Sequence, residues 1–518
     1  MVVIATVEEP CELFNIAAIT NGKKRPILDN EDIIRNYRLN DNMVEKIEEL
    51  CRELEKILHD NFTYVGVDFD DGKNRFREAN TASKKRDSKT GKLENVQYIN
   101  VNRTYSRLAV FHFKVRFKDP RTGDVSLCKA DMPIYIPQFI DDYHYYIRGN
   151  LYSAPFQVID STVYQSRDNG IVLKTLNRAI KLSKSRTTVT DVHGMPFKTD
   201  VFHIHMGKKK IPFLLYYFSY FGYFRTMQFF GVDKFIKLYN EAPVDPDEKL
   251  VFFKFGKYYL GVDRDTWNSN YLLKQYVATM LALNRKNLDL EDMGNVYYWM
   301  RTLGAYISQT KPFEQGSALL TTFITCLDAR TIINVNRIVG GSKKDTPWTI
   351  LRWMFIDFAS LSNKNTSLRN KRLRYTEYLI APLVREVQMK LYRYLKTRPK
   401  MRDMKRLLDI LKISSSCICH SIIGKTKSKN TALNITKYSS QVNDFSIINS
   451  ALKWSKAGPQ SAIERTTAKR ASAQMRAMDA SCLGNLDMIS FSSLNCGIAG
   501  VICPWAEVDK DTMTFKSV

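Results

Sequence analysis

The spacing of apolar residues changes along this chain, and the change limits the folds open to it. Between Leu108 and Phe117 apolar and polar residues partly alternate, which is typical of a half-buried strand. Between Tyr375 and Lys396 the apolar residues recur at steps of three and four, which predicts one buried stripe on a long helix. The chain has 518 residues, more than one hydrophobic core usually holds. We therefore expect a mixed α+β, multidomain protein.

The same patterns predict further elements and some of the core. Helices are predicted over 31–60, 211–240, 270–335 and 347–360, and strands over 60–128, 127–165 and 185–206. Pro and Gly in the segment Lys118–Asp124 predict a turn, and a second turn is predicted at His193-Gly194. Trp299, Trp348 and Trp353 are the expected core anchors of the helical part.

Positive charge is concentrated in one part of the sequence. The chain holds 78 Lys and Arg against 53 Asp and Glu, a net charge of +25. Residues 361–480 hold 25 Lys and Arg against seven Asp and Glu, which is +18 of that total. Such a field favours a polyanion or an acidic partner. Nucleic acid is the favoured partner, although ribosomal and membrane-surface proteins carry similar charge.

The cysteines and the apolar segments indicate a cellular setting. Nine scattered cysteines in a large chain are typical of free thiols in a reducing compartment. The N-terminal residues lack the basic start of a signal peptide. The run from Ile211 to Phe224 is too short to cross a bilayer. We expect a soluble intracellular protein with no membrane partner.

Three groups of residues resemble metal or catalytic sites, but each has a simpler interpretation. The carboxylates in Val67-Asp-Phe-Asp-Asp-Gly72 are spaced to hold Mg²⁺, and an acidic turn after a strand is the favoured alternative. Cys417-Ile-Cys419-His420 lacks the second ligand pair of a structural zinc site, so buried thiols are favoured. His203 and His205 alternate on a predicted strand, which favours a solvated or hydrogen-bonded face. With no phosphate-binding loop or nucleophile elbow in the sequence, we predict neither catalytic nor metal-binding residues on this chain.

The basic segment near the C-terminus is the stronger candidate for a functional site. Lys453-Trp-Ser-Lys456 precedes a turn at Gly458-Pro459, and further cations follow. Cations and neutral amide donors suit the phosphates, sugars and base edges of nucleic acids. A solvated basic loop is the alternative. The predicted nucleic-acid-binding residues are Gln441, Asn443, Lys453, Lys456, Arg465, Lys469 and Arg470.

Four stretches resemble, in order, the β subunit of bacterial-type multisubunit RNA polymerases. The first is Asp131-Met-Pro-Ile134 with Tyr145–Leu151 and Pro155-Phe-Gln157; the second is Lys208–Leu215 with Phe221-Gly222; the third is Asn370-Lys-Arg-Leu-Arg374; the fourth comprises Ser440-Gln441, Phe445, Ala457-Gly-Pro459, Glu464-Arg465 and Gly500-Val-Ile502. Together they span about residues 115–502. The segment between Phe445 and Gly458 is shorter than the rifampicin-binding stretch of that family, so the resemblance does not imply drug binding.

The resemblance implies a domain organisation. Residues 1–160 and 371–440 would form a protrusion-like domain, residues 161–370 a lobe-like domain, and residues 441–518 a fork-like domain that continues on a separate chain. The sequence ends at Val518, soon after the fork-like part, whereas the β subunit of that family continues. The chain thus resembles the N-terminal part of the split β-like subunit of a giant (jumbo) phage polymerase, with the non-virion enzyme preferred over the virion-packaged one.

The resemblance also implies a function and partners. The chain would line the DNA channel and the RNA–DNA hybrid in a DNA-directed RNA polymerase, while another subunit binds the Mg²⁺ ions used in nucleotidyl transfer. The implied partners are a C-terminal β-like chain, split β′-like chains, a promoter-specificity subunit, and template DNA and RNA. The enzyme would act in the host cytoplasm during infection, and packaging in the virion is compatible with the sequence. The alternative is a stand-alone basic DNA-binding or packaging protein of a phage.

Overall fold

We analysed the fold in a computed structural model of the chain. The structure describes residues 43–70, 81–86, 93–98, 106–138, 145–147, 150–153, 156–166, 169–175, 178–206, 209–241, 249–340, 344–361, 367–368, 371–422, 440–441, 453–456, 476–486, 496–503, 506–509 and 512–516.

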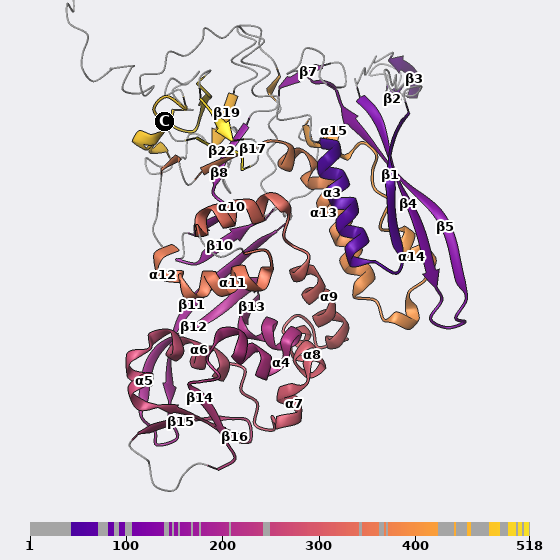
Figure 1. The fold of residues 1–518 in the computed structure, drawn as a ribbon. Helices are drawn as coiled ribbons and strands as arrows, with labels where there is room; N and C mark the ends of the chain where they lie inside the picture. Colours follow the sequence, from indigo (N-terminus) through magenta and orange to yellow (C-terminus); the bar gives the residue numbers. More distant parts are fainter. Residues whose placement is uncertain are drawn as a thin grey trace, which may run out of the picture.

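The described residues form two hydrophobic cores. The first core is built from two separate stretches of chain, Met43–Val158 and Leu368–Phe515. The second core is built from the continuous stretch Val163–Phe358, which lies between them in the sequence. Helices and antiparallel strands occur in both cores, as Figure 1 shows, so the expected mixed architecture is confirmed.

A three-stranded antiparallel sheet and two helices form most of the first core. The sheet has the order β1-β4-β5, made of Phe62–Asp70, Ser106–Lys118 and Val125–Pro137. Helix α3 (Met43–Ile57) packs against β1 and β4, and α13 (Thr376–Leu395) lies beside α3 (Figure 1). The predicted stripe of α13 is buried at Leu379, Leu383, Val384, Val387 and Leu391. Alternation therefore predicted β4, and three-to-four spacing predicted α13.

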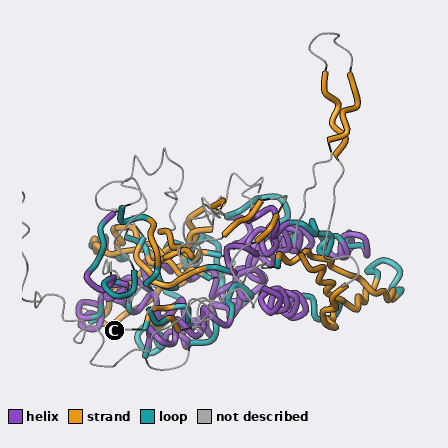
Figure 2. The backbone as a smooth tube through the Cα atoms, turned by 90° about the horizontal axis from the view of Figure 1, so that it is seen from above, coloured by secondary structure: helices purple, strands orange, loops and turns teal. Residues whose placement is uncertain are grey.

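Shorter elements complete the first part of the chain. The predicted turn Lys118–Asp124 joins β4 to β5, with the Asp119 amide donating to the Asp124 carbonyl over 2.8 Å. A second hairpin of β2 (Thr81–Arg86) and β3 (Leu93–Tyr98) extends away from the rest of the structure in Figure 2. Beyond α13 lie η4 (Pro399–Met401), α14 (Met404–Leu408) and α15 (Cys417–Ile422).

Small strands join the two stretches of the first core. A four-stranded sheet has the order β17-β8-β19-β20, made of Lys371–Arg374, Phe156–Asp160, Lys453–Lys456 and Ala499–Val501. A three-stranded sheet has the order β18-β7-β6, made of Ser440–Gln441, Asn150–Ser153 and Tyr145–Ile147. The 3₁₀ turn η5 (Ala480–Cys482) and the pair β21 (Val508–Asp509) and β22 (Thr514–Phe515) complete this part.

The second core packs helices around two antiparallel sheets. One sheet has the order β13-β12-β11-β10-β9, made of Lys209–Pro212, Pro196–Met206, Ala179–Thr190, Ile171–Lys174 and Val163–Gln165. The other has the order β14-β16-β15, made of Ile236–Tyr239, Tyr258–Asp263 and Leu250–Phe255. The helices are α4 (Leu214–Phe230), α5 (Arg264–Ser269), α6 (Tyr271–Leu281), α7 (Leu290–Gly294), α8 (Val296–Ala305), α9 (Pro312–Ile324), α10 (Ala329–Val339), α11 (Pro347–Ile356) and α12 (Phe358–Leu361). Trp299, Trp348 and Trp353 are buried here, as predicted.

Two predicted helices differ from the observed ones. The prediction of helix over 211–240 is wrong at its end, because Gly231 adopts a left-handed conformation with φ of 70° and stops α4. The chain then forms strand β14, whose Ile236 is buried in the second core. Of the helix predicted over 31–60, the described part is α3, and residues 31–42 lie outside the described residues.

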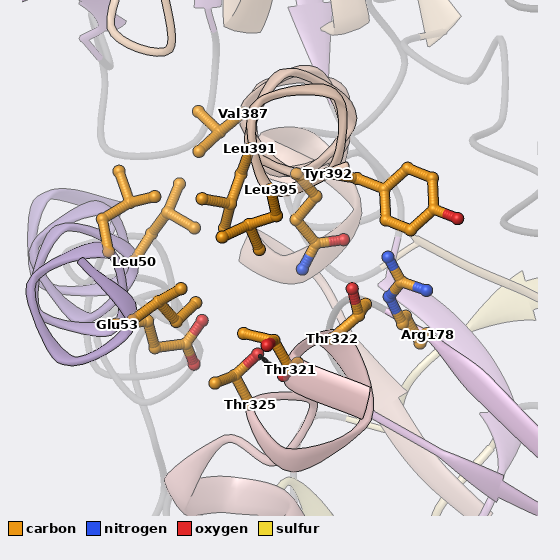
Figure 3. Close-up of a pocket in the computed structure, with 13 residues that line it drawn as sticks. Leu50, Glu53, Arg178, Thr321, Thr322, Thr325, Val387, Leu391, Tyr392 and Leu395 are labelled. Atoms are coloured by element: carbon orange, nitrogen blue, oxygen red, sulfur yellow. Dashed lines mark hydrogen bonds between the residues drawn. The ribbon is translucent and has the colours of Figure 1, made fainter. Parts of the chain in front are cut away.

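The two cores meet around a small cavity. Side chains of α3, α9 and α13 line it, together with Arg178 at the start of β11 (Figure 3). Its volume of about 20 Å³ leaves room for one water molecule. The first and second cores are therefore in direct contact through helices, with no room for a larger ligand between them at this cavity.

No single helix among the described residues has the length and apolar character of a membrane span. Helices α9 and α10, which are bent by 66° relative to each other, meet that test only as a pair.

Two glycines allow α8 and α9 to approach closely, and this generates a stability prediction. A Cβ atom built on Gly304 would lie 1.6 Å from the Pro312 carbonyl oxygen, and one on Gly316 would lie 1.9 Å from the Met300 carbonyl oxygen. Because both neighbours are backbone atoms, we expect Gly304→Ala to lower the free energy of unfolding by about 3 kcal/mol or more, measured by urea denaturation. Gly294→Ala is the matched control, since its nearest atom would be 3.8 Å away. Equal stability of the two variants would contradict this packing.

Candidate nucleic-acid interface

Three sequence segments far apart in the chain converge in the four-stranded sheet. Strand β8 pairs with β17 in antiparallel fashion, with Gln157 opposite Arg374. Strand β19 runs parallel to β8, with Trp454 opposite Phe156, and β20 pairs with β19, with Gly500 opposite Trp454. These strands carry parts of the first, third and fourth stretches that resemble the polymerase β subunit. Parts of three of the four stretches therefore lie in one small sheet.

Burial of a tryptophan fixes the position of the strand that carries two of the predicted contact residues. Trp454 is 1% exposed and packs in the first core between the neighbouring strands. Lys453 and Lys456 form the two ends of β19 around it. The backbone of both lysines is thus held in a paired strand, and both lie close in the fold to β8 and β20.

Five other contact residues were predicted, of which the structure describes one. Gln441 lies in β18 and pairs with Tyr152 of β7, which precedes β8 in the sequence. Two separated parts of the basic segment, β18 and β19, therefore join neighbouring strands of the N-terminal stretch. Asn443, Arg465, Lys469 and Arg470 lie outside the described residues. Nucleic-acid contact by these seven residues remains a prediction.

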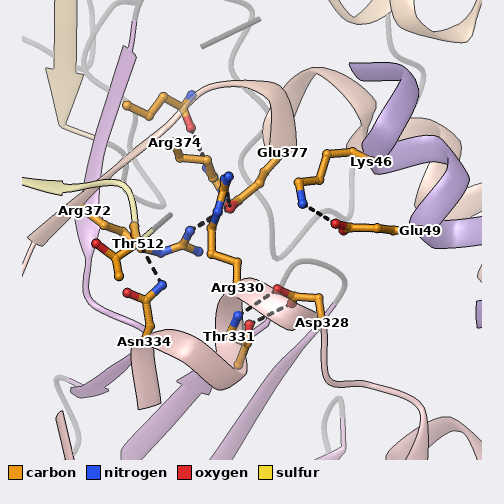
Figure 4. A network of polar contacts seen from close by, with 11 residues as sticks. Lys46, Glu49, Asp328, Arg330, Thr331, Asn334, Arg372, Arg374, Glu377 and Thr512 are labelled. Carbon is orange, nitrogen blue, oxygen red and sulfur yellow. Dashed lines mark hydrogen bonds and ion pairs between the residues drawn. The ribbon is translucent and has the colours of Figure 1, made fainter. Parts of the chain in front are cut away.

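A buried charge network lies next to this sheet (Figure 4). Glu377, in the first turn of α13, accepts two hydrogen bonds of 2.8 Å from Arg372 of β17. Arg330 of α10, a helix that packs with the second core, donates to the same carboxylate over 3.2 Å. Arg374 donates to the side-chain oxygen of Gln157 on β8. The network connects β8, β17 and α13 of the first core to a helix of the second.

The electrostatic balance of this network favours a charged carboxylate. Arg372 is 3% exposed and Glu377 is 6% exposed. Burial alone would raise the pKa of Glu377, but Arg372 and Arg330 outweigh burial and lower it from 4.5 to about 2. Nearby, burial lowers the pKa of Lys174 to about 7, with Arg374 and Arg372 adding to the effect. Cations thus outnumber carboxylates around the junction.

The C-terminal strands attach to the same junction. The Leu373 amide of β17 donates to the Met513 carbonyl over 2.7 Å. Asn334 of α10 donates to the Thr512 carbonyl over 3.3 Å, and Arg337 donates to the Thr512 hydroxyl over 3.1 Å. Helix α10 therefore contacts both α13, through Arg330 and Glu377, and the segment that ends in β22.

The candidate Mg²⁺ motif does not form a metal centre among the described residues. Asp68 lies on β1 with its side chain 86% exposed, and its Oδ2 atom is 3.2 Å from the His112 Nε2 atom. Strand β1 ends at Asp70, while Asp71 and Gly72 lie outside the described residues. Within the part of the chain that the structure describes, no group of three or more His, Cys, Asp or Glu side chains is arranged to hold a metal ion.

The cysteine and histidine motifs have structural roles. Cys417 and Cys419 are each 6% exposed in the first core, and burial raises the pKa of the Cys417 thiol to about 12. Their interpretation as buried thiols is confirmed. His205 is within 2.6 Å of the Ser183 hydroxyl across the β11–β12 pair, which confirms the expected hydrogen bonding for His205 but not for His203.

Sequence reasoning missed the Arg–Glu network. The sequence does contain a signal for it. Arg372 and Arg374 are two residues apart on a short strand, and Glu377 follows in the first turn of the next helix. An acidic residue at a helix N-terminus after alternating arginines suits a charge pair across a strand–helix turn. The third partner, Arg330, is remote in sequence and gives no such signal.

Comparison with known proteins gives the class of this chain, which is that of an RNA polymerase subunit. The family model described as non-virion RNA polymerase subunit matches residues 18–515. The chain belongs to this family. No curated protein sequence matches it. The match confirms the expected resemblance to an RNA polymerase subunit and to the non-virion enzyme. Membership of this family implies other polymerase subunits as partners.

The network generates a prediction about stability and its pH dependence. We expect Glu377→Gln to lower the free energy of unfolding by about 3 kcal/mol at pH 7, because Arg372 and Arg330 lose their buried counter-charge. The pKa of Glu377 is lower in the folded chain than in the unfolded chain. Its contribution is therefore complete above about pH 4.5 and is lost as the pH falls toward 2.

Urea denaturation of both proteins between pH 2 and pH 7 measures this effect. The wild-type chain should lose more stability on acidification than Glu377→Gln. The control is Glu386→Gln, which removes an i,i+4 pair with Lys390 at 3.5 Å that is partly open to solvent and contributes less than about 1 kcal/mol. Parallel pH profiles of the wild type and Glu377→Gln would show that the carboxylate does not stabilise the junction.

Proposed function

We propose that this chain is the N-terminal part of the β-like subunit of a split, multisubunit RNA polymerase of a giant (jumbo) phage. In this proposal its protrusion-like, lobe-like and fork-like parts line the DNA channel and the RNA–DNA hybrid. The observation that carries the proposal is the convergence of β8, β17, β19 and β20 in one sheet. Three stretches that resemble the β subunit meet there, although they lie far apart in the sequence.

The architecture of the cores supports the same proposal. The first core is assembled from two separated stretches, and the second core forms wholly from the chain between them. A protrusion in two pieces with a lobe inserted between them has this arrangement. The fork-like segment supplies β19 and β20, which complete the sheet started by β8 and β17.

Catalysis is assigned to the assembly and not to this chain. Nucleotidyl transfer uses Mg²⁺ ions held by carboxylates. The described residues do not fit such a centre, because the Asp68 side chain is exposed on β1 with His112 as its neighbour, and no group of three or more metal-ligating side chains is arranged around an ion among them. We therefore assign the Mg²⁺ to another subunit and give this chain the role of binding nucleic acid. Its partners would be a C-terminal β-like chain, β′-like chains and a promoter-specificity subunit, assembled in the host cytoplasm during infection.

A tagged copy of the chain purified from infected cells tests the assembly. We expect it to bring down one further β-like chain and two β′-like chains, identified by mass spectrometry, with RNA synthesis on a DNA template in the purified fraction. Recovery of DNA without protein partners would instead identify a stand-alone DNA-binding or packaging protein.

The lysines of β19 provide a test of the proposed interface. We expect Lys453→Ala combined with Lys456→Ala to reduce the slope of log affinity for template DNA against log salt by up to about 2 in the assembled enzyme, because each lost phosphate contact contributes about 0.9. The matched control replaces Lys234 and Lys237, two exposed lysines at β14 in the second core. An unchanged slope in the β19 variant would exclude these lysines from the interface.

A further inference from the structure

A second basic surface lies at the other end of α13 from the sheet that holds Lys453 and Lys456. Residues 393–412 hold eight Lys and Arg against two Asp. The β4–β5 turn joins this segment, since the Arg121 Nε atom donates to the Lys400 carbonyl over 3.0 Å. Figure 1 shows the lower ends of β4 and β5 beside α14. The fold thus adds the cation of Arg121 to a segment that is already strongly basic.

Three of the four arginines of this segment hold the loop in place, and so structural contacts account for only part of its charge. Arg402 donates to the Leu395 carbonyl over 2.7 Å and to the Thr397 carbonyl over 3.1 Å, which satisfies groups at the C-terminal end of α13. Arg406 donates to the Met401 carbonyl. Arg398 pairs with Glu314 of α9 at 3.5 Å. These three guanidinium groups therefore stabilise the loop between α13 and α14.

The carboxylates of the segment are also engaged. Asp403 is the N-cap of α14 and accepts from the Arg406 amide over 2.7 Å. Asp409 accepts from Lys412 over 2.9 Å. Both carboxylates stay charged, but two of them against eight cations leave the segment strongly positive.

Three exposed lysines of the segment differ from these arginines in making no short side-chain contact among the described residues. Lys396, Lys400 and Lys405 make no ion pair and no side-chain hydrogen bond with any residue that the structure describes. Lys396 lies at the C-cap of α13, where the negative end of the helix dipole favours a positive charge. That effect does not explain the exposed cations of Lys400 and Lys405. We name Lys396, Lys400 and Lys405 the α13–α14 basic surface.

We propose that the α13–α14 basic surface binds the phosphate backbone of duplex DNA. Protein–protein interfaces are depleted in lysine, whereas protein–DNA interfaces are strongly positive. Helix α13 has 20 residues and is about 30 Å long, so the surface lies roughly that far from the β17 end of the helix. That distance is close to one turn of duplex DNA, about 34 Å. In this proposal one duplex reaches from the α13–α14 basic surface toward the sheet at the β17 end of α13.

The inference rests on the proposed function, because the natural form of the chain is then an assembled polymerase. The test is the salt dependence of duplex DNA binding by the assembled enzyme, with Lys396, Lys400 and Lys405 all replaced by alanine. We expect the slope of log affinity against log salt to fall by about 2 to 3. Because these lysines make no ion pair among the described residues, the variant loses only weak interactions such as that of Lys396 with the helix dipole, and its unfolding temperature should stay close to that of the wild type.

The control variant replaces Lys234, Lys237 and Lys254, three exposed lysines of the second core, and should leave the slope unchanged. An unchanged slope for the α13–α14 variant would overturn this inference. If the variant of Lys453 and Lys456 showed a reduced slope in the same experiment, the proposed function would still stand. Loss of a protein subunit from the purified enzyme, with DNA binding unaltered, would show an acidic protein partner and would also overturn it. Failure of the wild-type chain to enter any polymerase would instead refute the proposed function.

Discussion

The buried carboxylate of Glu377 is the interaction on which the arrangement of this chain depends. Two arginines from different cores, Arg372 and Arg330, share it. Desolvating three charges is costly, and good geometry with direct hydrogen bonds offsets that cost. The same strand that supplies Arg372 pairs with β8 and binds the Met513 carbonyl. One ionic cluster thereby sets where α10, α13 and the C-terminal strands lie relative to one another.

Local patterns in the sequence predicted the elements whose structure is decided by local chemistry. The alternation around Phe111 gave β4, the Pro and Gly after Lys118 gave its turn, and the stripe beginning at Leu379 gave α13. The end of α4 was missed because a single glycine, Gly231, outweighs the apolar run around it. A continuous apolar stretch is compatible with either helix or strand, so only tertiary packing decides between them.

The candidate site was predicted as residues but not as an arrangement. Lys453 and Lys456 were singled out by charge, and the structure places their backbone in β19. Strand β19 runs parallel to β8, which lies some 300 residues earlier in the sequence. A single sequence contains no signal for this pairing. Long-range pairing depends on the whole core. The sequence also does not show which cations of the α13–α14 loop make structural hydrogen bonds. Arg402 and Lys400 are both positive residues in the sequence, and only the structure shows that Arg402 donates to backbone carbonyls while Lys400 is exposed.

The parallel pairing of β8 and β19 also sets an order for folding during synthesis. The second core is continuous in sequence and becomes complete while β8 still lacks its partner. At 5–20 residues per second, the ribosome needs roughly 15 to 60 s to reach β19 after making β8. Strand β17 is made first and covers one edge of β8, but the edge that pairs with β19 stays open for the whole interval, and such an edge invites pairing with other chains. The nascent chain therefore has a defined interval in which it is most prone to misassembly.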